Sequence, residues 1–411
     1  MSAGPGDLGR DDLAVLLPEL LLCGHLIDRA GMPHILGRFG RDGMRDIAIE
    51  EWQGASPHYT KRMQRALQYE GDDLITIFKG LQLDVGAPPQ FLDFRFTVET
   101  PQRGRFQLDY CGALMDVEPM GEDYVEAMCV DIEDPTMDAT ALATNPRARM
   151  RPLHRPPRVP AGREPHCEWL VDIDESREPV LWPDFTLEVG RSEAATYAGV
   201  SAIDPADDGD SDYSGTIMSD VDFNRFSRSA LVRIAEEVAL QWHLLVISGR
   251  RAIGVRTDEE ETADIVRKQF TGVSGITAER LAAALELGRG PADIAALWRI
   301  HPAFQPPGYT GVTVREDGEV PVLVIPADSP AVRDGAWASL LSMDHLEPVE
   351  AILHAVDPTW HAAATATNEG LEVRPVRGEA GDESSEVALV RFSKGAGFAF
   401  KPRRALPLTV V

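Results

Sequence analysis

Three of the four cysteines lie close enough in the sequence to share a metal ion, because Cys111, Cys129 and Cys167 fall within 57 residues. Glu126 precedes Cys129 by three positions, so one helical turn would direct two ligands towards the same ion. Tetrahedral zinc accepts thiolate, carboxylate and imidazole ligands. We therefore predict a zinc site whose ligands are Cys111, Glu126, Cys129 and Cys167. His166 is an alternative ligand. The alternative is that the cysteines only pack in the core, since separations of 18 and 38 residues are looser than a Cys-x-x-Cys pair.

Acidic residues and histidines beside these cysteines suggest hydrolytic chemistry. A hydrolytic site needs a group that activates water and groups that neutralise developing charge. Asp131 follows Cys129 closely, with Glu133 and Asp134 just beyond it, and two histidines lie further along the same region. We predict as catalytic residues Asp131, His154 and His166.

Six arginines fall between Arg147 and Arg163, in a chain whose formal net charge is −26. Guanidinium groups bind carboxylates through paired hydrogen bonds, so this segment is a candidate anion clamp. The alternative is a surface loop whose arginines balance neighbouring acids or contact a partner. We predict as substrate-binding residues Arg147, Arg149 and Arg155.

The order of these motifs resembles a known family. The motifs are Cys111 near the end of a strand, Cys129-Val130-Asp131, Asn145-Pro146-Arg147 and Cys167-Glu168-Trp169. Their order is similar to that of the L-2-amino-thiazoline-4-carboxylic acid hydrolase-like family over about residues 20–175, and to small-molecule-binding domains of the vinyl-reductase type, some of which hold structural zinc. The resemblance implies a site that opens a cyclic amidine of a small sulfur heterocycle by adding water. The chain departs from the family in its second domain and in the Arg/Pro-rich insert after Asn145.

A second group of titratable residues lies near the C-terminal end. Glu350, His354 and Asp357 are spaced i, i+4 and i+7, which places them on one helix face, and His345 and His361 lie nearby. Such a face could bind a metal or transfer protons. We interpret it as a solvated helix face, which is the commoner origin of this spacing.

Two runs of alternating polar and apolar residues must position Cys111, the first cysteine of the cluster. Residues 91–100 and 105–117 alternate in polarity around a short turn, which predicts a β-hairpin with Cys111 on its second strand. Residues 166–174 predict a further strand that carries Cys167. The strongest helical periodicity covers residues 226–245.

The expected fold class is α/β of the α+β kind. Residues 1–180 should form a helical segment and an antiparallel sheet, which the resemblance relates to the vinyl-reductase and aminothiazoline carboxylate hydrolase-like fold. Residues 181–222 contain five aspartates in nine positions and predict an acidic linker. Residues 223–411 should form a second, helix-rich α/β domain, with closing strands at 371–376, 387–392 and 397–402.

Composition excludes several partners. The balance of 40 basic against 66 acidic residues repels phosphate backbones, so we expect no nucleic-acid partner. No stretch reaches the roughly 18 to 20 apolar residues of a membrane span. The apolar run 13–26 follows Asp11 and Asp12 and contains Pro18, so we do not interpret it as a targeting sequence. Four cysteines are too few for a disulfide-stapled fold, which favours a cytoplasmic protein with reduced thiols.

Two functions agree with these patterns. The first is a hydrolase that acts on a non-peptide C–N bond of a small anionic molecule, such as a cyclic amidine or carboxylate, at the cysteine-rich site. The alternative is a non-catalytic small-molecule-binding or assembly protein with a structural metal, in which the apolar face of helix 226–245 forms a homo-oligomer interface. The motifs GxxxxGK[ST], GxSxG and HExxH are absent, which removes P-loop, serine-hydrolase and zincin classes.

Overall fold

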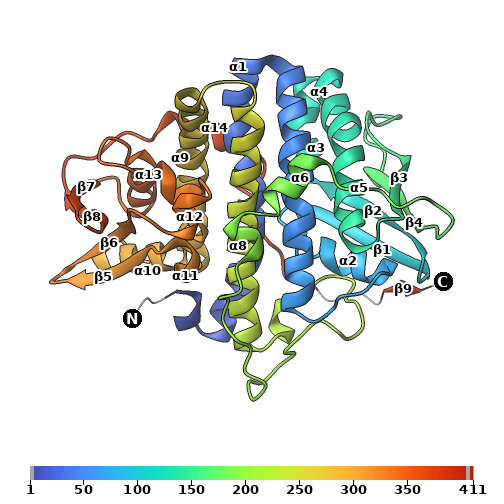
Figure 1. Cartoon of the computed structure of the whole chain (residues 1–411), viewed down its shortest axis with the longest axis horizontal. Coiled ribbons are helices and arrows are strands. Elements are labelled where there is room, and N and C mark those ends of the chain that lie inside the picture. The colour runs from blue at the N-terminus through green and yellow to red at the C-terminus, as the bar shows by residue number, and fades with distance from the viewer. Residues whose placement is uncertain (1–3, 404–407, 411) are drawn as a thin grey trace.

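The longest helix, α1 (Arg10–Ala66), folds back on itself at Gly40 in the computed structural model, which describes residues 4–403 and 408–410. Gly40 has φ 70° and ψ −179°, a backbone conformation that favours glycine because it has no Cβ. The two arms of α1 lie side by side (Figure 1). They are joined by a 2.7 Å hydrogen bond from the Trp52 indole on the second arm to the Asp28 carboxylate on the first.

Two further long helices, α8 (Arg228–Gly254) and α9 (Glu259–Ala284), pack against α1 (Figure 1). The predicted helix over residues 226–245 is confirmed as part of α8. Its apolar face lies in the core of the same chain, where Trp242 is fully buried. This face therefore gives no support to the homo-oligomer interface that we considered. Among the described residues, no helix is long and apolar enough to cross a membrane.

The first sheet confirms the predicted hairpin and the predicted strand at 166–174. Its spatial order is β3-β4-β2-β1-β9, with β1 to β4 antiparallel and β9 parallel to β1. Cys111 is the last residue of β2, as expected. The strands are β1 (Leu92–Thr100), β2 (Arg103–Cys111), β3 (Ala148–His154), β4 (Cys167–Ile173) and β9 (Thr409–Val410).

Short helices flank this sheet. A π-helical segment, Ala127–Ile132, joins two of them into one continuous run that carries Cys129. α5 packs against both α1 and β3, so it bridges the long helix and the sheet (Figure 1). The helices are α2 (Leu74–Leu81), α3 (Gly112–Val117), α4 (Glu122–Glu126) and α5 (Glu133–Thr144).

The second half of the chain contains another antiparallel sheet, of order β5-β6-β8-β7. Its strands are β5 (Thr313–Asp317), β6 (Val320–Pro326), β7 (Trp360–Thr367) and β8 (Gly370–Arg377). The helices around it are α10 (Pro291–Ile300), α11 (Pro307–Thr310), α12 (Pro330–Arg333) and α13 (Glu347–Val356). The chain is thus a mixed α/β protein with two separate sheets.

Of the predicted closing strands, 371–376 is confirmed as part of β8, whereas 397–402 is not a strand. The predicted strand at 387–392 is also wrong, because this segment forms helix α14 (Ser385–Val390). The Ser384 hydroxyl accepts a hydrogen bond from the Val387 amide and caps the helix. Val387 and Val390 are three residues apart and both buried, so a single helix face packs towards α9.

The hydrophobic cores divide the chain differently from the expected domains. One core joins α1 to α8, α9 and the second sheet, and the other lies between the first sheet and its flanking helices. Residues 10–66 therefore pack largely with the segment beyond residue 223. The expected linker 181–222 holds the short helices α6 (Asp184–Val189) and α7 (Glu193–Thr196). It is anchored by buried Tyr213, whose amide donates a 2.8 Å hydrogen bond to the Leu67 carbonyl.

Candidate functional site

The three clustered cysteines are buried near one another around the first sheet. Cys111 ends β2, Cys167 begins β4 and Cys129 lies in the π-helical segment. Burial raises the pKa of Cys111 to about 12 and the pKa values of Cys129 and Cys167 well above the usual range, and the nearby Glu133 carboxyl adds to each shift. The thiols are therefore protonated at neutral pH and are not activated nucleophiles.

These cysteines do not assemble into the predicted zinc site. Glu126 is exposed, whereas Cys129 three residues later is buried, so the helix presents the two side chains to different environments. Within residues 4–403 and 408–410, the one group of three His, Cys, Asp or Glu ligand atoms lying within 4.8 Å of each other is Glu350, His354 and His361. The set of Cys111, Glu126, Cys129 and Cys167 fails this distance requirement.

We expect all four thiols to react slowly while the protein is folded. Cys23 is also buried, and burial raises its pKa to about 12. At pH 8, Ellman's reagent should react about 100-fold more slowly with the folded protein than with protein in guanidinium chloride. The unfolded protein should titrate as four thiols. A rapidly reacting thiol in the folded protein would contradict this placement.

The three predicted catalytic residues lie in different segments of the fold. Asp131 is exposed, and its carboxylate lies 3.8 Å from the Arg45 guanidinium. His154 ends β3, and partial burial lowers its pKa. His166 is buried, and its Nδ1 accepts a 3.1 Å hydrogen bond from the Cys111 amide, which ties the start of β4 to the end of β2. None of the three lines either cavity described below.

The arginine-rich segment forms local pairs instead of an open anion clamp. Arg155 pairs with Asp134, while Arg147 and Arg149 each donate a hydrogen bond to a backbone carbonyl oxygen. Two further pairs are Arg151 with Asp138 and Arg158 with Glu118. Arg151, Arg155 and Arg158 thus balance neighbouring acids, as the alternative expected, although Arg149 and Arg151 lie on strand β3 and not in a loop. None of the six arginines lines the cavities.

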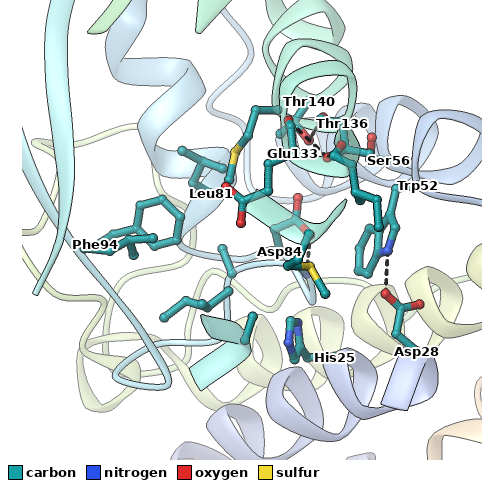
Figure 2. Close-up of a pocket in the computed structure, with 18 of the residues that line it drawn as sticks. His25, Asp28, Trp52, Ser56, Leu81, Asp84, Phe94, Glu133, Thr136 and Thr140 are labelled. Atoms are coloured by element: carbon teal, nitrogen blue, oxygen red, sulfur yellow. Dashed lines mark hydrogen bonds between the residues drawn. The ribbon is translucent and has the colours of Figure 1, made fainter. Parts of the chain in front are cut away.

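Two adjacent cavities lie beside α1. The inner one is between α1, α5 and the first sheet, and the outer one is between α1, the short helical segments after β2, and α14 with the residues that follow it. The inner cavity has a volume of about 90 Å³ and contains several charged side chains (Figure 2). The outer cavity has a volume of about 280 Å³ and is mainly apolar. Both are lined by Arg29, Met32, Met128 and Ile132. Because methionine side chains are flexible, small movements of Met32 and Met128 would connect the two cavities.

Two carboxyl groups reach the inner cavity from different elements. Asp84 follows α2, Glu133 begins α5, and Figure 2 shows both side chains directed into the same space. Burial raises the pKa of Asp84 to about 6 and that of Glu133 to about 7. Asp84 Oδ1 accepts 2.7 Å hydrogen bonds from the Tyr59 hydroxyl and the Gly86 amide, which leaves Oδ2 to carry a proton. Enclosed carboxyls that titrate near neutral pH are typical of catalytic acids and bases.

The first arm of α1 supplies further titratable groups to the inner cavity. Burial, aided by the charge of Arg29, lowers the pKa of His25 to about 3, so the ring is neutral. Asp28 accepts the hydrogen bond from Trp52 and lies beside Glu51. Burial raises the pKa of both carboxyls, and the charge of Asp28 raises that of Glu51 further. Neighbouring buried carboxyls resist double ionisation, so this pair retains a proton.

Arg29 carries a positive charge at the boundary of the two cavities and is only 9 % exposed. Its Nε lies 3.3 Å from Asp116 Oδ2, and the Ser393 hydroxyl and Lys394 amide also donate hydrogen bonds to Asp116. Among the described residues, the guanidinium of Arg29 donates one hydrogen bond, to the Met32 sulfur at 3.2 Å. A guanidinium has five N–H donors, so Arg29 retains donors for a ligand.

Apolar side chains form the mouth of the outer cavity. Phe392 is 84 % exposed and Met120 is 51 % exposed, and both line this cavity. Leu389 of α14 lies on the same wall, so the C-terminal segment completes a site that begins in α1. Exposed apolar groups around a concave apolar site are typical of small-molecule binding.

Sequence reasoning missed most residues of these cavities. Asp28 and Arg29 directly follow the apolar run 13–26 on the first α1 arm, and charged residues at such positions are a usable signal because unpaired burial is costly. Asp84 stands in a loop and Glu133 in an acidic stretch, so neither position has a comparable signal. In the sequence, Glu133 stands out only as a neighbour of Asp131.

The fold and cavities define a mixed α/β protein in which a small cavity with several titratable side chains adjoins a larger, mainly apolar one, which is an arrangement common to small-molecule sites. No family model matches the chain, and no curated protein or solved structure matches it.

Proposed function

We propose that the protein hydrolyses a C–N bond of a small molecule whose reacting group enters the inner cavity and whose apolar part occupies the outer one. The observation that carries this proposal is the pair Asp84 and Glu133, two enclosed carboxyls with pKa values of about 6 and 7 that face the same space. Such a pair can supply both a base and an acid at neutral pH.

Glu133 is the proposed general base. With a pKa of about 7, a substantial fraction of Glu133 is ionised at neutral pH and can take a proton from water as the water oxygen attacks the carbon of the C–N group. In the fraction of molecules in which Asp84, with a pKa of about 6, is protonated, Oδ2 then donates this proton to the departing nitrogen, while Tyr59 and Gly86 hold Oδ1. Transfer of the proton from Glu133 back to Asp84 through water completes the turnover. The net reaction adds one water molecule across the C–N bond.

Arg29 is the proposed anchor for an anionic substrate. It is buried between the two cavities and keeps donors that no carboxylate or carbonyl of the described residues occupies. A substrate carboxylate at Arg29 would place its apolar body towards Met120 and Phe392 and its reacting group towards Glu133. The proposed substrate is therefore a small carboxylate with an apolar body and a hydrolysable C–N bond.

This reaction class agrees with the one implied by the resemblance to the aminothiazoline carboxylate hydrolase-like family, although the proposed residues differ from those expected there. We also propose a cytoplasmic location, because the four buried free thiols suit a reducing compartment.

A matched panel of compounds tests the proposal. It pairs small cyclic amidines and amides with their carboxylated analogues, beginning with 2-aminothiazoline and 2-aminothiazoline-4-carboxylate. Mass spectrometry after incubation with the folded protein should reveal a product heavier by one water molecule for carboxylated members. If the folded protein consumes no member of the panel, hydrolysis of this class is excluded.

Arg29→Lys should weaken the preference for carboxylated substrates. Lysine keeps the charge but loses the planar paired donors, so kcat/KM for the carboxylated compound should fall about 10- to 100-fold. The uncarboxylated partner should change by less than about two-fold. Arg155→Lys is the matched control, because Arg155 pairs with Asp134 outside the cavities. Equal losses on both compounds would contradict the anchor.

A second candidate function is ligand binding without turnover. The larger outer cavity favours it, since that cavity is mainly apolar and excludes both Asp84 and Glu133 from its lining. Calorimetry with the same panel separates the two functions. A binding protein would take up carboxylated members without forming product, and Glu133→Gln would leave the affinity unchanged.

A further inference from the structure

A compact cluster of two imidazoles and one carboxylate lies on the second sheet. Glu350 and His354 come from α13, His361 comes from β7, and their ligand atoms all lie within 4.8 Å of one another. We propose that this cluster binds one divalent first-row transition ion of the zinc type. Imidazole nitrogen with carboxylate oxygen suits such ions, and three protein ligands leave a further position for water or another ligand.

The three ligand atoms converge on one side of the Glu350 carboxylate. Glu350 Oε1 lies 2.6 Å from His361 Nδ1 and 3.2 Å from His354 Nε2. The His354 nitrogen is buried and has no hydrogen-bonding partner among the described residues, because its approach to Glu350 lacks hydrogen-bond geometry. A buried nitrogen aimed at a carboxylate oxygen without a hydrogen bond is expected where a cation would complete the contact.

The remaining polar atoms of the cluster are held by the backbone. His361 Nε2 lies 2.7 Å from the Glu379 carbonyl oxygen, to which it can donate only when it carries the proton. In the neutral ring that carries its proton on Nε2, the lone pair of Nδ1 points at the cluster. The other carboxylate oxygen, Glu350 Oε2, accepts a hydrogen bond from the Ala362 amide, so Oε1 is the oxygen that faces the two imidazoles. Backbone partners of this kind orient histidine and carboxylate ligands in metal sites.

A glycine-containing loop closes behind both imidazoles. A Cβ at Gly381 would lie 2.5 Å from His354 Cε1, and a Cβ at Gly378 would lie 2.7 Å from His361 Cδ2. The loop is fixed by hydrogen bonds from the Gly378 and Gly381 amides to the carbonyls of Thr359 and Pro358, at 2.9 and 2.8 Å. Both rings are therefore confined before any ion binds, which lowers the entropic cost of binding.

The surroundings of the cluster favour a cation. Glu379 and Asp382 lie on the same exposed loop and add negative charge near the rings. The site lies at the far side of the molecule from the two cavities, since α13 and β7 are separated from the first sheet by α8 and α9 (Figure 1). It is therefore independent of the proposed hydrolytic function.

Zinc titration of the full-length, chelator-stripped protein under reducing conditions tests the proposal. We expect one equivalent of zinc to bind, and we expect Glu350→Gln and His361→Ala each to weaken binding about 100-fold or more. His345→Ala is the matched control and should bind as the wild type does, because His345 lies outside the cluster. Absence of stoichiometric binding by the wild type, or unchanged affinity in Glu350→Gln and His361→Ala, would overturn the assignment.

Cobalt absorption provides a second readout that does not depend on the variants. Co²⁺ bound to imidazole and carboxylate should show ligand-field bands without a thiolate-to-cobalt charge-transfer band. Such a charge-transfer band would locate the ion at the cysteines and overturn the proposal. Circular dichroism of each variant establishes that an affinity change does not arise from unfolding.

Discussion

Glu133→Gln is expected to lower kcat for any hydrolysed compound of the panel by about 100-fold or more. Glutamine has nearly the shape of glutamate but cannot take a proton from water. Because the mechanism needs an ionised Glu133, whose pKa burial raises to about 7, and a protonated Asp84, whose pKa is about 6, the wild-type rate should rise with pH to a maximum near about pH 6.5 and fall above it. Steady-state kinetics from pH 5 to 9 measures both effects, and the variant should lose this ascending limb.

Asp131→Asn provides the matched control for Glu133→Gln. It also removes a carboxyl from the same acidic stretch, but its side chain is exposed and lies outside both cavities. We expect less than about two-fold change in kcat for this variant. A large loss in Asp131→Asn together with an active Glu133→Gln would restore the site first expected from the sequence and remove the one proposed from the cavities.

The same Glu133→Gln substitution should make the protein comparatively more stable as the pH rises. Below about pH 4 the Glu133 carboxyl is protonated in both the folded and unfolded states. Between about pH 4 and pH 7 the unfolded carboxyl ionises first, because burial raises the folded pKa to about 7, so the wild type loses stability over this window. This loss amounts to about 2 to 3 kcal/mol, and glutamine does not incur it.

Urea unfolding at pH 5 and pH 8 measures this difference. The free energy of unfolding of Glu133→Gln minus that of the wild type should increase by about 2 kcal/mol from pH 5 to pH 8. The comparison between variants is necessary because buried neutral histidines, such as His243 with a pKa lowered to about 4, produce an opposing trend in both proteins. A difference that stays constant with pH would show that the Glu133 carboxyl is not desolvated in the folded protein.

Elements whose apolar residues recur at a regular spacing were predictable from the sequence. The β1–β2 hairpin follows from alternating polarity around a short turn, and α8 follows from its apolar spacing. The segment 387–392 was misjudged because its apolar residues suit a strand or a helix, and packing against α9 decides between them. The return of α1 at Gly40 brings residues of the first arm beside the second, and this could not be foreseen because only the backbone conformation of one glycine produces it.

The site was less accessible to sequence reasoning because its residues come from separate elements. Cys111, Cys129 and Cys167 are indeed buried near Glu133, so the sequence directed attention to the correct region. Their motif spacing, however, carries no information about which side of the helix each residue faces. In our proposal, Arg29 binds the substrate carboxylate, which is the role that the sequence predicted for the arginine-rich segment. The placement of Arg29 depends on the contact between α1 and the helices after β2.

Turnover in water enriched in oxygen-18 tests the central claim most directly, since hydrolysis must transfer one oxygen atom from solvent to product. The account predicts one labelled oxygen in the product formed from 2-aminothiazoline-4-carboxylate or another carboxylated panel member by the wild type and by Asp131→Asn. Glu133→Gln should form less than about 1 % of that labelled product in the same time. Absence of labelled product from the folded wild type, or equal labelling by Glu133→Gln, would contradict it.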